Sequence, residues 1–196
     1  MFKFKRTRRV GVAAAIALSV TLVAAGCANS GDAGAGSGEG DAANLTITML
    51  PKNLGNPYFD TSTKGAKAAT EEFGGKFEQV GPTEASPTAQ VQYIQTAAQQ
   101  GVGGLIVSAN DPAALCDALA DARSAGVKVV TFDSDTNPEC RDLFVNQATA
   151  EGIAKVQVDL ITEQIGSKGK IAILSSTPNA TNQNAWIEIM KEELKA

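Results

Sequence analysis

The sequence predicts an α/β fold of Rossmann type, a parallel sheet with helices on both faces. Strand-like and helix-like segments alternate from residue 45 to residue 196, which is the order of βαβ units. One run, GLIVSA (104–109), is almost entirely apolar, as in a strand that is buried on both faces. KVVTFD (128–133) repeats that strand signal one helix later.

The elements follow one another in strict order. The predicted strands are short segments at 45–50, 76–80, 104–109, 128–133, 143–146 and 170–176. The predicted helices lie between and after them, at about 58–73, 87–100, 113–126, 149–166 and 182–196. The first helix follows Asn56 and Pro57, a favoured capping residue and a favoured first helical residue. The third has leucines at 115 and 119 and ends in a glycine.

The first 26 residues have the composition of an export signal. Five basic residues precede the apolar run 10–22, and small residues lead into Cys27. A transmembrane helix is the alternative, but the run is shorter than the ~20 residues that a membrane span needs. The tripeptide AAG before Cys27 resembles a bacterial lipobox, with Ala24 where that pattern prefers leucine. The resemblance implies that Cys27 becomes the lipid-bearing N-terminus, and the Gly/Ser/Ala-rich stretch that follows it, up to residue 43, is a flexible tether.

Charge and residue usage exclude several classes of function. Removing the leader takes away five of the 17 basic residues and none of the 21 acidic ones, so the formal charge falls from −4 to −9. An acidic surface disfavours nucleic acid. The chain has no histidine, which excludes Ser/His/Asp and Cys/His catalytic sites and His-ligated zinc within these 196 residues. We therefore predict no catalytic residue, no metal and no cofactor.

Two cysteines remain once Cys27 is assigned to lipid. Cys116 and Cys140 would then lie in an oxidising compartment where a disulfide persists, and we predict that they pair. Two separate buried thiols are the alternative.

Polar and aromatic side chains gather where the predicted strands end. The strand ends read PKNLGNPYF (51–59), SANDP (108–112), FDSDTNPE (132–139) and STPNATNQNAW (176–186). In open parallel sheets, ligands bind beyond the carboxyl ends of the strands. We therefore expect these four segments to form one binding site.

The side chains at these ends suit a neutral polyol. Amides and carboxylates bond hydroxyl groups, and aromatic rings cover the apolar side of a sugar. Candidate polar groups are Asn56, Asp133, Asp135, Asn182 and Gln183, and candidate rings are Tyr58, Phe59 and Trp186. A phosphate ligand is disfavoured because the glycine-rich phosphate motifs are absent and Lys52 is the one cation here.

Five of the candidates also have a purely structural interpretation. Asn56 caps the following helix in that interpretation, and Asp133 and Asp135 form the turn in SDTNP. Trp186 is as consistent with a core position as with a ring that stacks on a sugar. Lys52 is, on this view, a solvated loop lysine.

The motifs KNLGNPYF, IVSAND, VVTFDSDTNPEC, NQATAEG and SSTPNATNQNAW resemble the sugar-binding branch of the type I periplasmic solute-binding proteins of ABC importers. Within it, the chain is most similar to the group that binds rhamnose or autoinducer-2 (AI-2). The resemblance implies two lobes that close on a small ligand, here at 44–147 and 148–196. It places ligand contacts on Lys52, Phe59 with Tyr58 beside it, Asp133, and the pair Asn182 and Gln183. AI-2 binders carry aspartate where this chain has Asn182, which favours a deoxyhexose such as rhamnose.

The resemblance also implies partners and a location. It predicts a monomer, lipid-anchored on the outer face of the cell membrane, that delivers a small sugar to permease subunits. Because proteins of this family continue beyond the equivalent of residue 196, we expect a second lobe that is incomplete here. Alternatives are an AI-2 receptor that signals to a partner protein, an exported glycoside-active enzyme using Asp133 and Asp135, and a repressor of the same fold, which the export leader disfavours.

Overall fold

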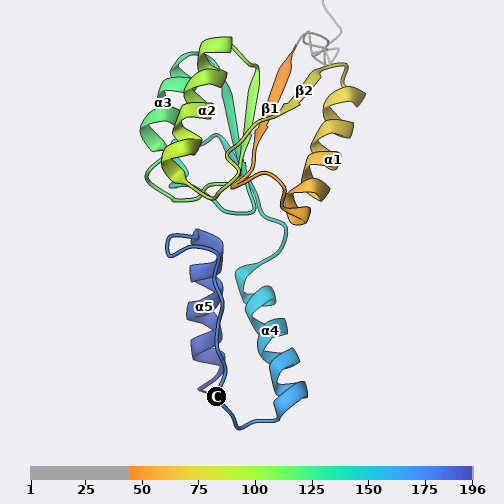
Figure 1. Cartoon of the computed structure of the whole chain (residues 1–196), viewed down its shortest axis with the longest axis vertical. Helices are drawn as coiled ribbons and strands as arrows, with labels where there is room; N and C mark the ends of the chain where they lie inside the picture. Colours follow the sequence, from red (N-terminus) through yellow and green to blue (C-terminus); the bar gives the residue numbers. More distant parts are fainter. Residues whose placement is uncertain (1–44, 196) are drawn as a thin grey trace, which may run out of the picture. The chain divides into compact units, whose positions relative to one another are not determined.

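A five-stranded parallel sheet forms the centre of the computed structural model, which describes residues 45–195 (Figure 1). Its strands stand in the order β2-β1-β3-β4-β5, and every neighbouring pair is parallel. The strands are β1 (Thr46–Leu50), β2 (Lys76–Gln79), β3 (Gly104–Val107), β4 (Lys128–Phe132) and β5 (Leu143–Val145). The predicted fold class is confirmed.

Helices follow the strands in the predicted order. They are α1 (Pro57–Glu72), α2 (Pro87–Gln100), α3 (Cys116–Ser124), the short 3₁₀ helix η2 (Pro138–Cys140), α4 (Ala150–Ile165) and α5 (Thr181–Glu193). Side-chain caps fix three of the helix starts, since Asn56, Ser86 and Thr149 accept bonds from backbone N–H groups in the first turns of α1, α2 and α4. These caps explain why the predicted helix boundaries agree with the structure to within a few residues.

Helices α2 and α3 cover one face of the sheet, and α1 lies on the other side (Figure 1). The buried core lies under α2 and α3, where Leu105, Val107 and Val129 of the sheet pack with Ile94 and Leu119 of the helices. The opposite face is only partly covered. It contains an apolar groove of about 420 Å³, lined by Leu45, Ile47, Thr70, Phe73, Gly75, Gly103, Gly104, Leu105, Ile106, Lys128 and Val130.

The predicted strand at 170–176 is wrong. This segment connects α4 to α5 and has no regular secondary structure. A strand exists through hydrogen bonds to a neighbouring strand, and within residues 45–195 no strand pairs with it. Its apolar side chains are accordingly exposed, Leu174 at 98%.

The predicted signal peptide, Cys27 and the tether lie outside the described residues. Among the helices of residues 45–195, none combines the length and the apolar character that crossing a membrane requires.

Candidate functional site

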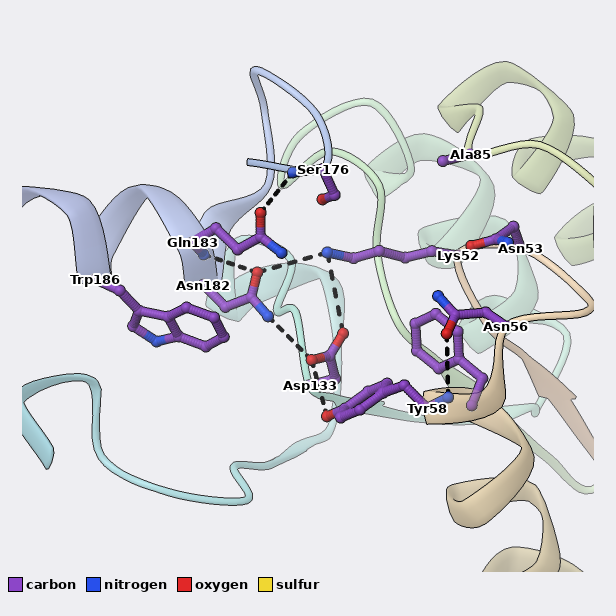
Figure 2. A pocket seen from close by; sticks show the side chains of 11 residues that line it. Lys52, Asn53, Asn56, Tyr58, Ala85, Asp133, Ser176, Asn182, Gln183 and Trp186 are labelled. Carbon is purple, nitrogen blue, oxygen red and sulfur yellow. Dashed lines mark hydrogen bonds and ion pairs between the residues drawn. The ribbon is translucent and has the colours of Figure 1, made fainter. Parts of the chain in front are cut away.

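The carboxyl ends of β1 and β4 and the start of α5 enclose a pocket of about 360 Å³ (Figure 2). A volume of this size suits a small ligand. The pocket is lined by Lys52, Asn53, Asn56, Tyr58, Phe59, Ala85, Asp133, Ser176, Asn182, Gln183 and Trp186. Eight of the nine candidate residues named from the sequence therefore lie together, and the ninth, Asp135, does not line the pocket.

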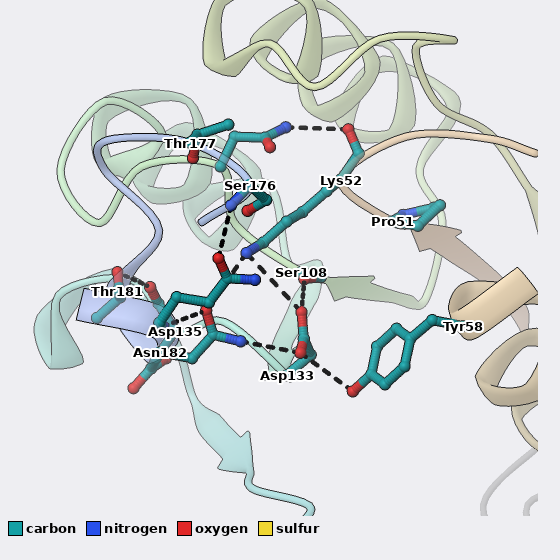
Figure 3. A network of polar contacts seen from close by, with 12 residues as sticks. Pro51, Lys52, Tyr58, Ser108, Asp133, Asp135, Ser176, Thr177, Thr181 and Asn182 are labelled. Carbon is teal, nitrogen blue, oxygen red and sulfur yellow. Dashed lines mark hydrogen bonds and ion pairs between the residues drawn. The ribbon is translucent and has the colours of Figure 1, made fainter. Parts of the chain in front are cut away.

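Asp133 is the centre of the pocket's hydrogen bonds. It follows the last residue of β4 and is only 7% exposed. Its Oδ1 accepts bonds from the Tyr58 hydroxyl at 3.1 Å and from Nδ2 of Asn182 at 3.0 Å. Its Oδ2 accepts a bond from the Ser108 hydroxyl at 2.7 Å and lies 3.9 Å from Nζ of Lys52 (Figure 3). The Asp133 carboxylate, which follows β4, thus links residues that follow β1 and β3 with residues at the starts of α1 and α5.

Lys52 extends into the pocket from the end of β1 (Figure 2) and is 5% exposed. Burial lowers the pKa of its ammonium group, and the nearby Asp133 partly opposes this effect. Within the described residues, Nζ makes a hydrogen bond to Oδ1 of Asn182 at 3.5 Å and an ion pair with Oδ2 of Asp133 at 3.9 Å. Both separations exceed the usual length of an N–H···O bond, near 2.9 Å. An ammonium group with three donors can therefore bond a further oxygen here.

Two aromatic residues stand beside this cluster. Phe59 is buried, and its ring packs edge to face against Tyr58 and Phe132. The Tyr58 hydroxyl donates to Asp133, and burial together with the charge and hydrogen bond of that carboxylate raises the pKa of Tyr58 to about 12. Trp186, half-buried on α5, lines the pocket from the other side.

The two remaining amides have structural as well as lining roles. Asn56 caps α1 by accepting a bond from the Tyr58 backbone N–H at 3.1 Å, and it also lines the pocket. The capping and pocket interpretations of this residue hold together. Oε1 of Gln183 accepts bonds from the Ser175 hydroxyl and the Ser176 N–H, at 2.8 and 2.7 Å, which fixes the segment before α5.

Asp135 points away from the pocket because another partner binds its carboxylate. Arg141 donates to both of its oxygens at 2.8 Å, and Thr131 and the Thr136 N–H donate to Oδ1. The interpretation of Asp135 as a turn residue describes its place better than the interpretation as a ligand contact.

The backbone at Asp133 has a left-handed conformation with φ of 59°, the single such case among the described non-glycine residues. Aspartate tolerates this conformation better than most residues, but it still costs free energy and is found mainly at functional sites. In this turn the Asp133 carboxylate accepts bonds from Tyr58, Ser108 and Asn182.

Cys116 and Cys140 form a disulfide that joins α3 to η2. It fastens the far end of the loop that begins at Asp133. No group of three or more acidic or cysteine side chains within residues 45–195 is arranged to hold a metal ion.

Four pocket or network residues were not singled out from the sequence. Ser108 is the first residue of SANDP, directly after the apolar run GLIV of β3, and a hydroxyl at the carboxyl end of a buried strand is a usable signal. Asn53 lies next to Lys52 in the same loop. Nothing in the local sequence distinguishes Ala85 or Ser176 from ordinary loop residues.

Comparison with known proteins decides the family. A family model described as periplasmic binding protein domain matches residues 47–196. The chain belongs to the periplasmic binding protein family. The resemblance seen in the sequence is thereby confirmed.

Three solved structures are similar over most of the chain. A sugar ABC transporter protein from Actinomyces odontolyticus is 48% identical, with a TM-score of 0.64, over 80% of this chain and 50% of its own. A solute-binding protein from Clostridium phytofermentas with bound L-rhamnose is 39% identical, with a TM-score of 0.75, over 78% of this chain and 47% of its own. LsrB from Clostridium saccharobutylicum in complex with AI-2 is 33% identical, with a TM-score of 0.70, over 77% of this chain and 49% of its own. The chain thus spans about half the length of each of these periplasmic binding proteins.

Proposed function

We propose that this chain is the sugar-binding part of a solute-binding protein of an ABC importer, and that its ligand is rhamnose or a related deoxyhexose. The single observation that carries the proposal is the cluster of Lys52, Asp133 and Asn182 in an aromatic-lined pocket. The relative with bound L-rhamnose, at 39% identity, supports the choice of sugar.

The cluster offers a sugar both kinds of hydrogen-bond partner. Lys52 donates, Asp133 accepts, and the amide of Asn182 does both. Adjacent hydroxyls can therefore bridge from one of these groups to the next. The Tyr58 and Trp186 rings offer apolar surface for the ring C–H groups and for the methyl group of a deoxyhexose.

The mechanism is capture without chemistry. We propose that residues 44–147 form one lobe and 148–196 the start of a second. Asn182 of the second contacts Asp133 and Lys52 of the first, so a ligand bonded to all three favours the arrangement in which they are close. A ligand shifts such an equilibrium only through its different affinity for the two states. Permease subunits that recognise the closed state would then complete transport.

A ligand screen tests the proposal directly. The chain with Cys27→Ser, which cannot be lipidated, is melted with pentoses, hexoses, deoxyhexoses and AI-2, followed by circular dichroism. At about 100 times the dissociation constant, a ligand stabilises the folded chain by about 2.7 kcal/mol. We expect a selective upward shift of Tm with L-rhamnose. A cooperative melt that no sugar shifts would overturn the assignment.

AI-2 is the second candidate, because a relative at 33% identity was solved in complex with it. Asn182→Asp is expected to weaken rhamnose binding and to raise the affinity for AI-2 relative to rhamnose. The amide that donates to Asp133 at 3.0 Å is replaced by a carboxylate that can only accept, so a ligand must supply hydroxyl donors to both acids. Calorimetric titration of both ligands against parent and variant measures the change. Asn184→Asp, on the exposed side of α5, is the control and should leave the affinity ratio unaltered.

The affinity for sugar is expected to fall as the pH rises. The fall should begin at a lower pH than the one at which an ordinary lysine loses its proton. Burial lowers the pKa of Lys52 below 10.5, so its proton is lost early, and the neutral amine that remains is a weaker donor without charge. In that same window the unfolded chain holds the proton that the folded chain has lost, so this group makes the free energy of unfolding rise with pH. Titration calorimetry and urea unfolding at each pH check both trends.

Lys52→Met is the control for this pH dependence. Its affinity is expected to be lower than that of the parent but flat across the same pH range. A parallel fall of affinity and stability in the parent would indicate general alkaline unfolding and contradict the role of Lys52.

We further propose that Cys27 carries a lipid that holds a monomeric protein at the outer face of the membrane. The support is the signal-like residues 1–26 and the Gly/Ser/Ala-rich stretch after Cys27. Cys27→Ala is expected to move the protein from the membrane fraction to the medium. Mass spectrometry of the mature N-terminus identifies the lipid, and a membrane-bound protein with an unmodified N-terminus would contradict the proposal.

A further inference from the structure

Asp135 and Arg141 form an ion pair behind the pocket that the sugar-binding proposal leaves unexplained. The guanidinium donates from Nε and Nη2 to the two oxygens of Asp135, both at 2.8 Å. The side chains are 16% and 19% exposed, whereas every other ion pair of residues 45–195 apart from Lys52–Asp133 has both partners at least 33% exposed. Arg141 is itself fixed, because its guanidinium lies 5.6 Å from the centre of the Phe144 ring on β5.

This pair closes the loop that begins with the left-handed turn at Asp133. The loop leaves β4, and the Asp135 side chain folds back to the Thr131 hydroxyl on that strand. The backbone oxygen of Ser134 accepts a bond from the backbone N–H of Ala109, just after β3, at 2.9 Å. A residue in a sparsely populated conformation persists only when its surroundings hold it there. Of the charged pairs at this loop, the fork from Arg141 is the shortest, at 2.8 Å, against 3.3 Å for Arg123–Asp142 and 3.9 Å for Lys52–Asp133.

The same residue reaches the other side of the pocket. The backbone oxygen of Asp135 accepts a bond from the Thr181 hydroxyl at 3.2 Å (Figure 3). Thr181 is the first residue of α5 and directly precedes Asn182, which donates to Asp133. Asp135 therefore has a link to the segments that carry Asp133 and Asn182, the two side chains that are hydrogen-bonded to each other in the pocket.

We propose that the Asp135–Arg141 ion pair is a positioning device that holds Asp133 and Asn182 in the geometry that binds the ligand. The inference rests on the proposed sugar binding, and neither member of the pair touches the ligand. A planar, two-bond fork suits this role because it fixes direction as well as distance.

Arg141→Met is the informative change, because it removes the fork and keeps an apolar stem over Phe144. We expect the dissociation constant for L-rhamnose to rise at least tenfold, measured by calorimetry well below the onset of unfolding. Arg123→Met is the matched control. Arg123 donates to the Glu139 backbone oxygen in the same loop at 2.8 Å and pairs with Asp142 at 3.3 Å, but it does not contact Asp135.

The control separates positioning from general loop stability. Both variants are expected to lower Tm, but Arg123→Met should change the dissociation constant less than twofold. Arg141→Lys keeps the charge without the fork and should give an intermediate affinity. Equal losses of affinity in Arg141→Met and Arg123→Met, or a loss below twofold in Arg141→Met, would overturn the proposal.

A second readout needs no ligand. In a Tyr93→Phe background, Tyr58 is the only tyrosine, and its ionisation is followed by absorbance at 295 nm. The Tyr58 pKa, raised to about 12 by burial and by Asp133, is expected to fall in Arg141→Met because the carboxylate is no longer held beside the phenol. If affinity drops while the Tyr58 titration is unchanged, Arg141 does not act through Asp133 and the proposal fails. If the parent binds no sugar, the proposed function fails, and the titration still decides whether the pair positions Asp133.

Discussion

Asp133→Asn is expected to weaken sugar binding by about 100-fold. The carboxylate accepts bonds from Tyr58, Asn182 and Ser108 and stands opposite the buried Lys52. An amide presents two donors where these partners also donate, and it leaves the Lys52 charge without its counter-ion. Losing a hydrogen-bond partner that carries charge costs about 1.5–3 kcal/mol, and 2.7 kcal/mol corresponds to about 100-fold in affinity. Calorimetric titration with L-rhamnose measures the loss.

Asp142→Asn is the matched control for this prediction. Asp142 accepts a bond from the Val129 backbone N–H and pairs with Arg123, both outside the pocket. Its replacement is expected to lower stability slightly and to change the affinity less than twofold. An affinity for Asp133→Asn within fivefold of the parent would show that the carboxylate is not a central ligand contact.

Replacing both Cys116 and Cys140 by serine is expected to lower the free energy of unfolding by about 3 kcal/mol. The disulfide closes a loop with a sequence separation of 24 residues, and a loop of this length restricts the unfolded chain by about that amount. For a domain of this size the change lowers Tm by roughly 6–12 °C. Urea unfolding of the Cys27→Ser chain, with and without the two further substitutions, gives the difference.

Reductant provides an independent check on the disulfide. Adding it to the Cys27→Ser chain should reproduce the melt of the double variant, and the double variant itself should not respond. A difference below 1 kcal/mol would mean that the two cysteines act as buried packing residues whose bond adds little.

Most of the fold could be predicted because its signals are local. Helix α1 begins where Asn56 and Pro57 predict it, since the cap and the first helical residue are adjacent in sequence. The buried strand β3 shows in the unbroken run GLIV. The segment 170–176 has the same local character, but no strand among residues 45–195 pairs with it. Strand identity depends on a distant partner, which apolar composition alone cannot supply.

The position of the candidate site was also predictable, but not every residue that faces it. The rule that ligands lie beyond the carboxyl ends of parallel strands places Lys52 and Asp133 together without any knowledge of distances. The rule could not separate Asp133 from Asp135, which lie two residues apart in one turn. Arg141, eight residues after Asp133, decides which carboxylate faces the pocket, because its fork captures Asp135. Contacts of this kind, made across a loop by a long side chain, leave no periodic signal in sequence.

The apolar groove on the side of the sheet opposite α2 and α3 has a spectroscopic consequence. Dyes that fluoresce on apolar surfaces report unfolding only when the folded protein offers them little to bind. The groove between Leu45, Ile47, Phe73, Ile106 and Val130 would take up such a dye before any heating. Its signal would then start high and flatten the transition. Trp186, the sole tryptophan of the chain, lines the sugar pocket, so its intrinsic emission offers a probe of both occupancy and unfolding that needs no added dye.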